Sequence, residues 1–189
     1  MVLFTSDNGP WISYGNHAGV TPFREAKGTG FDGGTRSACI VKYPGQIEAG
    51  SISERAFCSI GILPTICSIA EAPLPENEID GKDVWDILMN RPDAVNPHVY
   101  YPFSTGQRFE GIISGDGFWK LHVPHVYRTL VEPGMDGAAG TYRQETIELS
   151  LFDMKNDPYE TTNVLDQYPE IAKEMQRLAE AHKERFYGD

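Results

Sequence analysis

The sequence predicts an α/β fold in two parts: an α/β sheet segment over residues 1–95, then a small antiparallel four-stranded sheet packed with a C-terminal helix over residues 96–189. Two apolar runs near the N-terminus lack polar alternation, which is typical of strands buried in a parallel sheet. After Pro97 the pattern changes to short strands separated by turn signals. The chain has 189 residues, of which 40% are hydrophobic and 11% aromatic, enough for a core.

In the first part, we expect buried strands over residues 2–5 and 39–43, the first of them buried on both faces. Between them, residues 11–36 are rich in glycine and show little periodicity. Loops of this length inside a compact domain are commonly functional. A helix is predicted to begin near Gly61, with Pro64 in its first turn.

In the second part, four strands are predicted over residues 98–103, 111–114, 118–123 and 147–153. The Gly115-Asp116-Gly117 sequence indicates a tight hairpin between the second and the third. Residues 132–140 are expected to form an exposed loop. Apolar residues at spacings of three and four predict a helix over residues 169–186, with Pro169 in its first turn.

Composition excludes several function classes. The chain carries 16 basic against 27 acidic residues, a formal charge of −11, which argues against a nucleic acid or an anionic membrane surface as partner. No stretch approaches the ~20 apolar residues of a membrane-spanning helix.

Three scattered cysteines are expected to be buried free thiols. His17, His98 and His125 are expected to be isolated residues without ligand spacing.

Two short segments carry candidate chemistry. Asp7 and Asn8 follow a predicted strand directly and offer hard oxygen donors suited to Ca²⁺ or Mg²⁺. The same residue types also form simple turns. Lys27 lies among glycines in a segment that lacks Walker spacing but would let an anion approach the backbone. A solvated lysine on a glycine-rich turn is the alternative.

Together, the ordered motifs resemble the second half of a type I sulfatase, of the arylsulfatase A and N-acetylgalactosamine-6-sulfatase type within the alkaline phosphatase superfamily. The resemblance rests on the order and spacing of several segments, which run Phe4-Thr5-Ser6-Asp7-Asn8-Gly9-Pro10, Lys27-Gly28-Thr29-Gly30-Phe31-Asp32-Gly33-Gly34-Thr35-Arg36, Tyr43-Pro44-Gly45, Leu63-Pro64-Thr65-Ile66, Ile79-Asp80-Gly81, Lys120-Leu121-His122 and Leu151-Phe152-Asp153-Met154-Lys155-Asn156-Asp157-Pro158-Tyr159-Glu160-Thr161-Thr162-Asn163. The resemblance implies that residues 1–95 are the C-terminal part of an alkaline-phosphatase-like α/β domain carrying the metal and sulfate loops.

The resemblance also implies roles for four residues. Sulfatases hydrolyse sulfate esters with a formylglycine nucleophile and a calcium ion, so Asp7 and Asn8 would hold part of the Ca²⁺ and Lys27 would bind sulfate. His122 would contact sulfate or substrate from the smaller sheet, or else be a strand residue facing solvent. The ligand would be a small sulfate ester or a sulfated sugar. Relatives of this kind are periplasmic, extracellular or lysosomal.

The sequence departs from the family pattern in two ways. Gly61 stands where the family usually has Asp. No Cys or Ser is followed by x-Pro-x-Arg, and the early Asp-Asp pair and the middle His and Lys are absent. We therefore expect a C-terminal portion that is inactive alone, with an incomplete Ca²⁺ site and a formylglycine outside this chain. It would self-associate through exposed sheet edges.

Two other interpretations remain open. A phosphoryl-transfer enzyme of the alkaline phosphatase type would place His beside the strand-end Asp to bind zinc, whereas Asn8 favours a harder ion. A non-catalytic anion-binding or assembly module would keep the anion site without the nucleophile.

Overall fold

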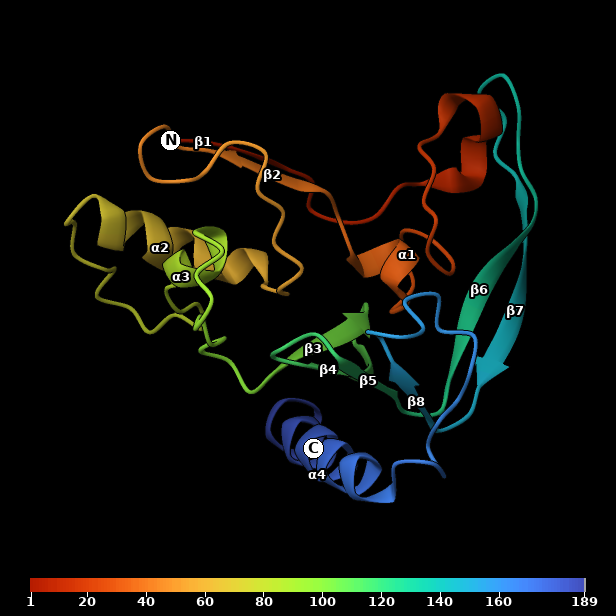
Figure 1. Ribbon diagram of the computed structural model, residues 1–189. Coiled ribbons are helices and arrows are strands. Elements are labelled where there is room, and N and C mark those ends of the chain that lie inside the picture. The colour runs from red at the N-terminus through yellow and green to blue at the C-terminus, as the bar shows by residue number, and fades with distance from the viewer. Residues whose placement is uncertain (189) are drawn as a thin grey trace.

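The computed structural model describes residues 1–188 and contains three antiparallel sheets and several helices (Figure 1). The largest sheet has four strands in the order β3-β4-β5-β8. Two further sheets have two strands each, β1-β2 and β6-β7. The combination confirms an α/β chain with a small antiparallel sheet and a C-terminal helix.

The four-stranded sheet is formed by β3 (Tyr100–Thr105), β4 (Arg108–Ser114), β5 (Trp119–His122) and β8 (Ser150–Asp153). Each neighbouring pair is antiparallel. The predicted tight turn joins β4 to β5, and Gly117 adopts a positive φ of 80° there, where its missing Cβ removes the steric penalty. The four strands predicted from the sequence are therefore confirmed.

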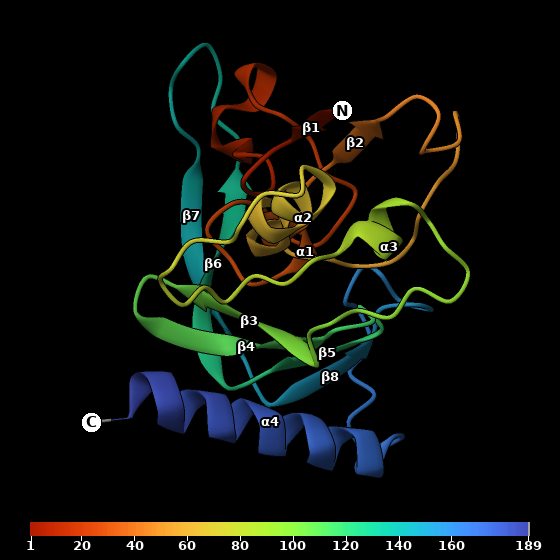
Figure 2. The same cartoon turned by 90° about the vertical axis from the view of Figure 1, so that its left-hand side faces the viewer.

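Helix α4 (Pro169–Tyr187) covers one face of this sheet, as the turned view shows (Figure 2). Pro169 opens the helix, where its missing N–H costs nothing. The apolar stripe of the helix packs against buried strand residues and against Val164, which lies between β8 and α4. The core contains Phe109, Ile112, Leu121, Leu151, Val164, Ala172, Met175 and Ala179. Burying a leucine side chain of this kind contributes roughly 1.5–3 kcal/mol.

A long hairpin that the sequence did not predict lies between β5 and β8 along the chain. Strands β6 (His125–Glu132) and β7 (Thr141–Ile147) pair over their length and project along one side of the molecule (Figure 1). Residues 133–140 form the predicted loop between them. Its backbone amides at Gly134 and Gly140 both donate to the carbonyl oxygen of Ser13, at 2.9 and 2.8 Å. The hairpin tip is thus attached to the short helix η1 (Ile12–His17).

The N-terminal strands differ from the prediction. Strand β1 (Val2–Thr5) pairs antiparallel with β2 (Cys39–Lys42), and both strands are largely exposed rather than buried. Val2, Phe4 and Ile40 are 63%, 68% and 63% exposed. The expectation of a parallel sheet was wrong, because the two strands pair antiparallel. Their exposure agrees with the expected exposed sheet edges, since within residues 1–188 this sheet has only two strands. Cys39 is exposed for the same reason, and Cys58 and Cys67 are half-buried, so the expected burial of the thiols was also wrong.

Helices complete the N-terminal part. They are α1 (Asp32–Thr35), the short η2 (Ser59–Gly61), α2 (Ile62–Ile69) and α3 (Trp85–Leu88). Helix α2 follows Gly61 directly, as predicted. The hydroxyl of Thr65 donates to the Gly61 carbonyl at 2.7 Å and accepts from the Val84 amide at 2.9 Å, which joins α2 to the start of α3. The domain boundary near residue 95 remains a prediction.

Within residues 1–188 no helix is both long enough and apolar enough to cross a membrane.

Candidate functional site

The two candidate loops lie against each other. The Gly9 amide donates to the Gly34 carbonyl at 2.9 Å, and the Lys27 amide donates to the Pro10 carbonyl at 3.1 Å. A Cβ at Gly9 would lie 1.9 Å from the Gly33 carbonyl oxygen, so only glycine permits this approach. The turn with Asp7 and Asn8 and the loop with Lys27 are therefore held together by backbone contacts.

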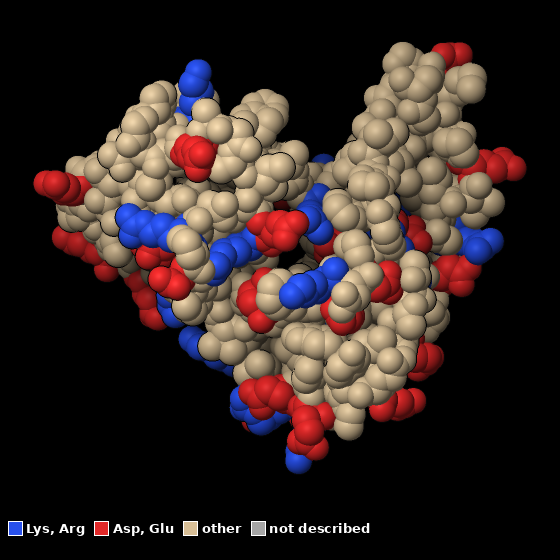
Figure 3. Space-filling view, in the orientation of Figure 1, with Lys and Arg blue, Asp and Glu red and all other residues tan. Residues whose placement is uncertain are grey.

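The side chains at this junction are accessible. Asp7 and Lys27 are exposed and Asn8 is half-buried. The Lys27 carbonyl accepts a hydrogen bond from the guanidinium of Arg128 on β6, at 2.9 Å. Figure 3 shows that the face seen in Figure 1 is hollowed between the β1–β2 side and the side of η1 and the β6–β7 hairpin. Side chains of both charges lie around this hollow. The roles of Asp7, Asn8 and Lys27 remain predictions.

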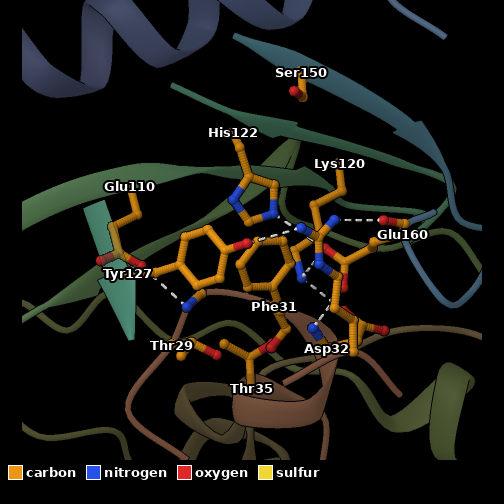
Figure 4. Close-up of polar contacts among 12 residues, drawn as sticks. Thr29, Phe31, Asp32, Thr35, Glu110, Lys120, His122, Tyr127, Ser150 and Glu160 are labelled. Carbon is orange, nitrogen blue, oxygen red and sulfur yellow. Dashed lines mark hydrogen bonds and ion pairs between the residues drawn. The ribbon is translucent and has the colours of Figure 1, made fainter. Parts of the chain in front are cut away.

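The loop after Lys27 is fixed to the small sheet by two buried carboxylates (Figure 4). Glu160 accepts a hydrogen bond from the Asp32 amide at 2.7 Å. Glu110 on β4 accepts one from the Gly30 amide at 3.0 Å, and its other oxygen accepts from Arg108 at 2.7 Å. Charge-assisted bonds of this kind are stronger than neutral ones. The backbone of residues 30–32 is thus attached to the second part of the chain.

Lys120 on β5 lies at the centre of this buried cluster. Its ammonium is 2.8 Å from an Asp32 carboxylate oxygen and 3.1 Å from a Glu160 oxygen. The side chains of Lys120 and Glu160 are 1% and 0% exposed. Burial alone would raise the pKa of Glu160, but the Lys120 ammonium and the His122 hydrogen bond together hold that pKa below its usual value. Lys120 therefore favours the ionised form of Glu160.

Phe31 joins the two sides of the cluster through its ring. It is fully buried, its ring stacks on His122 at 4.6 Å between centroids, and Tyr127 meets it edge-on at 4.8 Å. The guanidinium of Arg24 lies 4.2 Å from the same ring and donates to the Glu160 carbonyl at 2.7 Å. The loop is thereby anchored by apolar, aromatic and ionic contacts at once.

His122 belongs to this cluster and does not face solvent, so that alternative is wrong. Its Nε2 lies 3.0 Å from the Glu160 carboxylate, and its side chain is 0% exposed. Burial lowers its pKa to about 4, although the Glu160 hydrogen bond acts in the opposite direction. His122 is therefore neutral at pH 7. The structure places it among buried groups while Lys27 is exposed, and its role as a substrate contact remains a prediction.

His125 is not the isolated residue that the sequence suggested. Its ring stacks on His122 at 5.4 Å, and its Nδ1 lies 2.7 Å from the Val123 carbonyl. Its Nε2 is 3.6 Å from Glu110, too long for a hydrogen bond. Both this atom and Nδ1 of His122 are buried and have no hydrogen-bond partner among residues 1–188. Sequence reasoning missed this pairing because both residues were considered one at a time.

A metal ion would find only part of a site in this chain. Among residues 1–188, no three His, Cys, Asp or Glu side chains are grouped so that they could hold an ion. The carboxylate of Asp7 and the amide oxygen of Asn8 are hard donors of the kind Ca²⁺ binds, whereas Ca²⁺ takes about 6–8 oxygen ligands. The donor chemistry fits calcium, but two side chains supply only part of its coordination.

The chain resembles sulfatases over almost its whole length. It is 30% identical to bovine (Bos taurus) arylsulfatase A over 178 residues, covering 92% of this chain and 35% of that protein. It is 26% identical to N-acetylgalactosamine-6-O-sulfatase of Bacteroides thetaiotaomicron, covering 98% and 36%. No model of a known protein family matches it.

Solved sulfatase structures share the fold. The PsFucS1 sulfatase from Pseudoalteromonas superimposes with a TM-score of 0.77 at 21% identity, covering 99% of this chain and 38% of that one. Another neighbour, solved in complex with its substrate D-glucosamine-2-N,6-O-disulfate, gives a TM-score of 0.57 at 22% identity, with 99% of this chain and 34% of that one covered.

The fold is thus that of the sulfatases. Over nearly its whole length the chain is similar to arylsulfatase A and N-acetylgalactosamine-6-O-sulfatase, which supports a C-terminal sulfatase fragment, and it spans about a third of the length of the relatives it matches.

Proposed function

We propose that this chain carries half of the metal and anion site of a calcium-dependent sulfuric ester hydrolase. The observation that carries the proposal is the pair of backbone hydrogen bonds from Gly9 and Lys27, which bring the Asp7–Asn8 turn and the Lys27 loop together. The sulfatase relatives support it.

In this proposal each residue has a defined task. Asp7 and Asn8 supply oxygen ligands, and Lys27 attracts the sulfate anion with its exposed ammonium. Bound calcium would supply Lewis-acid polarisation of the sulfate oxygens. His122, being buried and neutral, would position the loop that contains Phe31, against which it packs. The formylglycine nucleophile would come from sequence outside these 189 residues, so the chain alone would not hydrolyse sulfate esters.

The proposed ligand is a small sulfate ester or a sulfated sugar. Two observations support the sugar: a relative is an N-acetylgalactosamine-6-O-sulfatase, and a structural neighbour was solved with a disulfated glucosamine. The competing non-catalytic module is favoured by the absence of an x-Pro-x-Arg motif after any Cys or Ser of this sequence.

Metal binding tests the proposal. We expect Ca²⁺, titrated calorimetrically, to bind the wild-type chain, and the Asp7→Asn variant to bind it roughly tenfold more weakly, because a charged ligand becomes neutral. Asp80→Asn, an exposed acid of another loop, is the matched control and should bind Ca²⁺ like the wild type. A preference for Zn²⁺ would favour the phosphoryl-transfer alternative instead.

Turnover is the second test. The purified chain with Ca²⁺ is expected to leave 4-nitrophenyl sulfate intact. Hydrolysis above background that disappears in Lys27→Gln would contradict the absence of the nucleophile.

A further inference from the structure

The hairpin that the sequence did not reveal brings a second cation to the Lys27 loop. Arg128 lies on β6, and its terminal nitrogen donates to the Lys27 carbonyl at 2.9 Å. Gly28, next to Lys27, has a positive φ of 90°, and a Cβ there would lie 2.6 Å from the Arg128 guanidinium. The guanidinium thus lies directly over the loop, 101 residues away along the sequence.

The Arg128 guanidinium also contacts an aromatic ring. Its central carbon lies 4.9 Å from the ring centroid of Tyr142, on the paired strand β7. Such a cation–π contact orients the planar group without using its N–H donors. A guanidinium has five donors, so the single bond to the Lys27 carbonyl leaves others available.

Neither cation is neutralised by a carboxylate within residues 1–188. The basic residues of the surrounding network do pair with acids: Arg36 with Asp32, Arg108 with Glu110, and Lys120 with Asp32 and Glu160. No ion pair in the described part of the chain includes Lys27 or Arg128. In a chain with 27 acidic residues, two residues in contact whose cationic groups pair with no carboxylate in the described part of the chain mark a place suited to an external anion.

We propose that Arg128 is a second anion-binding residue of the Lys27 site, and that together they hold the sulfo group of a sulfated sugar. The inference rests on the proposed function and extends it to a residue of the β6–β7 hairpin. Lys27 supplies a compact point charge, and Arg128 supplies a planar fork that can donate two parallel hydrogen bonds to the sulfo oxygens.

The test is an NMR titration of the ¹⁵N-labelled chain at constant ionic strength. The ligands are sodium sulfate and N-acetylgalactosamine 6-sulfate, followed through the amides of Lys27 and Gly28. We expect Arg128→Gln to raise the Kd about tenfold, in line with a lost charge-assisted hydrogen bond. Arg128→Lys keeps the charge but loses the fork, so an intermediate Kd is expected.

Arg143→Gln is the matched control, because Arg143 is an exposed arginine on the same hairpin that already pairs with Glu145. Its Kd should stay within about twofold of wild type, because Arg143 pairs with Thr129 and so its side chain leaves the hairpin on the face opposite to Arg128.

The outcomes separate the two claims. If the wild type binds sulfate and Lys27→Gln weakens binding while Arg128→Gln matches Arg143→Gln, the role of Arg128 is overturned and the proposed site stands. If the wild type binds neither ligand, the anion site fails, and the role of Arg128 fails with it. If Arg128→Gln does not fold, the Arg128→Lys variant is the test. A Kd equal to that of the wild type would then contradict the proposed two-donor contact of the Arg128 guanidinium with the sulfo group.

Discussion

The four-stranded sheet and the β1–β2 sheet are both antiparallel and both carry apolar side chains, but only the first buries them. In the four-stranded sheet, Leu121 and Leu151 are 0% exposed because α4 packs on one face. In β1–β2, Phe4 and Ile40 remain more than half exposed. Both sheets contain apolar strand residues, so the burial of these residues depends on what covers each face of the sheet.

The difference extends to charge. The small sheet also supplies Glu110 and Lys120, which with Glu160 fasten the glycine-rich loop of the other part. The loop is therefore exposed at Lys27 and anchored by buried hydrogen bonds at residues 30–32. Substitutions in the two regions test this contrast.

Removing Glu160 should have the largest effect on stability. Glu160→Ala leaves the Lys120 ammonium with one buried partner and removes the acceptor of the Asp32 amide. Breaking a buried pair in this way costs about 3–5 kcal/mol, measurable by urea unfolding. Glu174→Gln, which breaks an exposed pair with Arg177 inside α4, is the control and should leave the midpoint unchanged. Equal effects of both variants would contradict the anchoring role.

Core truncation should separate the two sheets directly. Leu121→Ala is expected to cost about 2–5 kcal/mol of unfolding free energy because it opens a cavity beneath α4. Ile40→Ala, on the exposed β2, should change that free energy by about 0.5 kcal/mol or less. Similar losses in the two variants would mean that β1–β2 is covered in solution.

Acid should weaken the anchored cluster. The pKa of His122 is lowered from 6.5 to about 4 by burial. The imidazole of His122 therefore binds a proton more readily in the unfolded chain than in the folded one. The associated stability is complete above pH 6.5 and is lost as the pH falls through about 4. The depressed pKa of Glu160 adds a loss in the same direction at lower pH.

Urea midpoints at a series of pH values measure this effect. In His122→Gln the urea midpoint should depend less steeply on pH below pH 6.5. The pH dependence that remains should come from His98 and His182, whose pKa values burial also lowers. An unchanged slope in this variant would contradict the buried neutral histidine.

The exposed sheet should affect association more than stability. We predict that the chain self-associates through β1–β2, because an uncovered apolar strand pair offers edges and faces to a second copy. Phe4→Ser should lower the mass measured by light scattering at high concentration without changing the unfolding midpoint. Ile52→Ser, which removes an equally exposed apolar residue elsewhere, is the control. A monodisperse wild-type monomer would contradict the prediction.

Local pattern was sufficient for much of the fold. The spacing of apolar residues predicted α4, and the Gly115-Asp116-Gly117 turn predicted the hairpin that Gly117 closes. The same reasoning failed for β1 and β2, because a continuous apolar run indicates a strand but not what covers it. It also did not predict the β6–β7 hairpin.

The candidate site was predictable only in part. Asp7, Asn8 and Lys27 lie in short motifs, whereas the cluster that anchors their loop joins positions such as Asp32 and Glu160, which are 128 residues apart. Charged residues are rarely buried unless paired, and no local signal identifies such partners. The same holds for Arg128, whose contact with Lys27 depends on the hairpin.

The most direct test of the central claim is sulfate binding measured calorimetrically for the wild type, Lys27→Gln and Lys42→Gln. Lys42 is an exposed lysine of β2 and provides the same charge change away from the loop. We predict that sulfate binds the wild type and Lys42→Gln alike, and that Lys27→Gln binds about tenfold more weakly or not at all. Equal binding by the two lysine variants would contradict the assignment of Lys27 to an anion site.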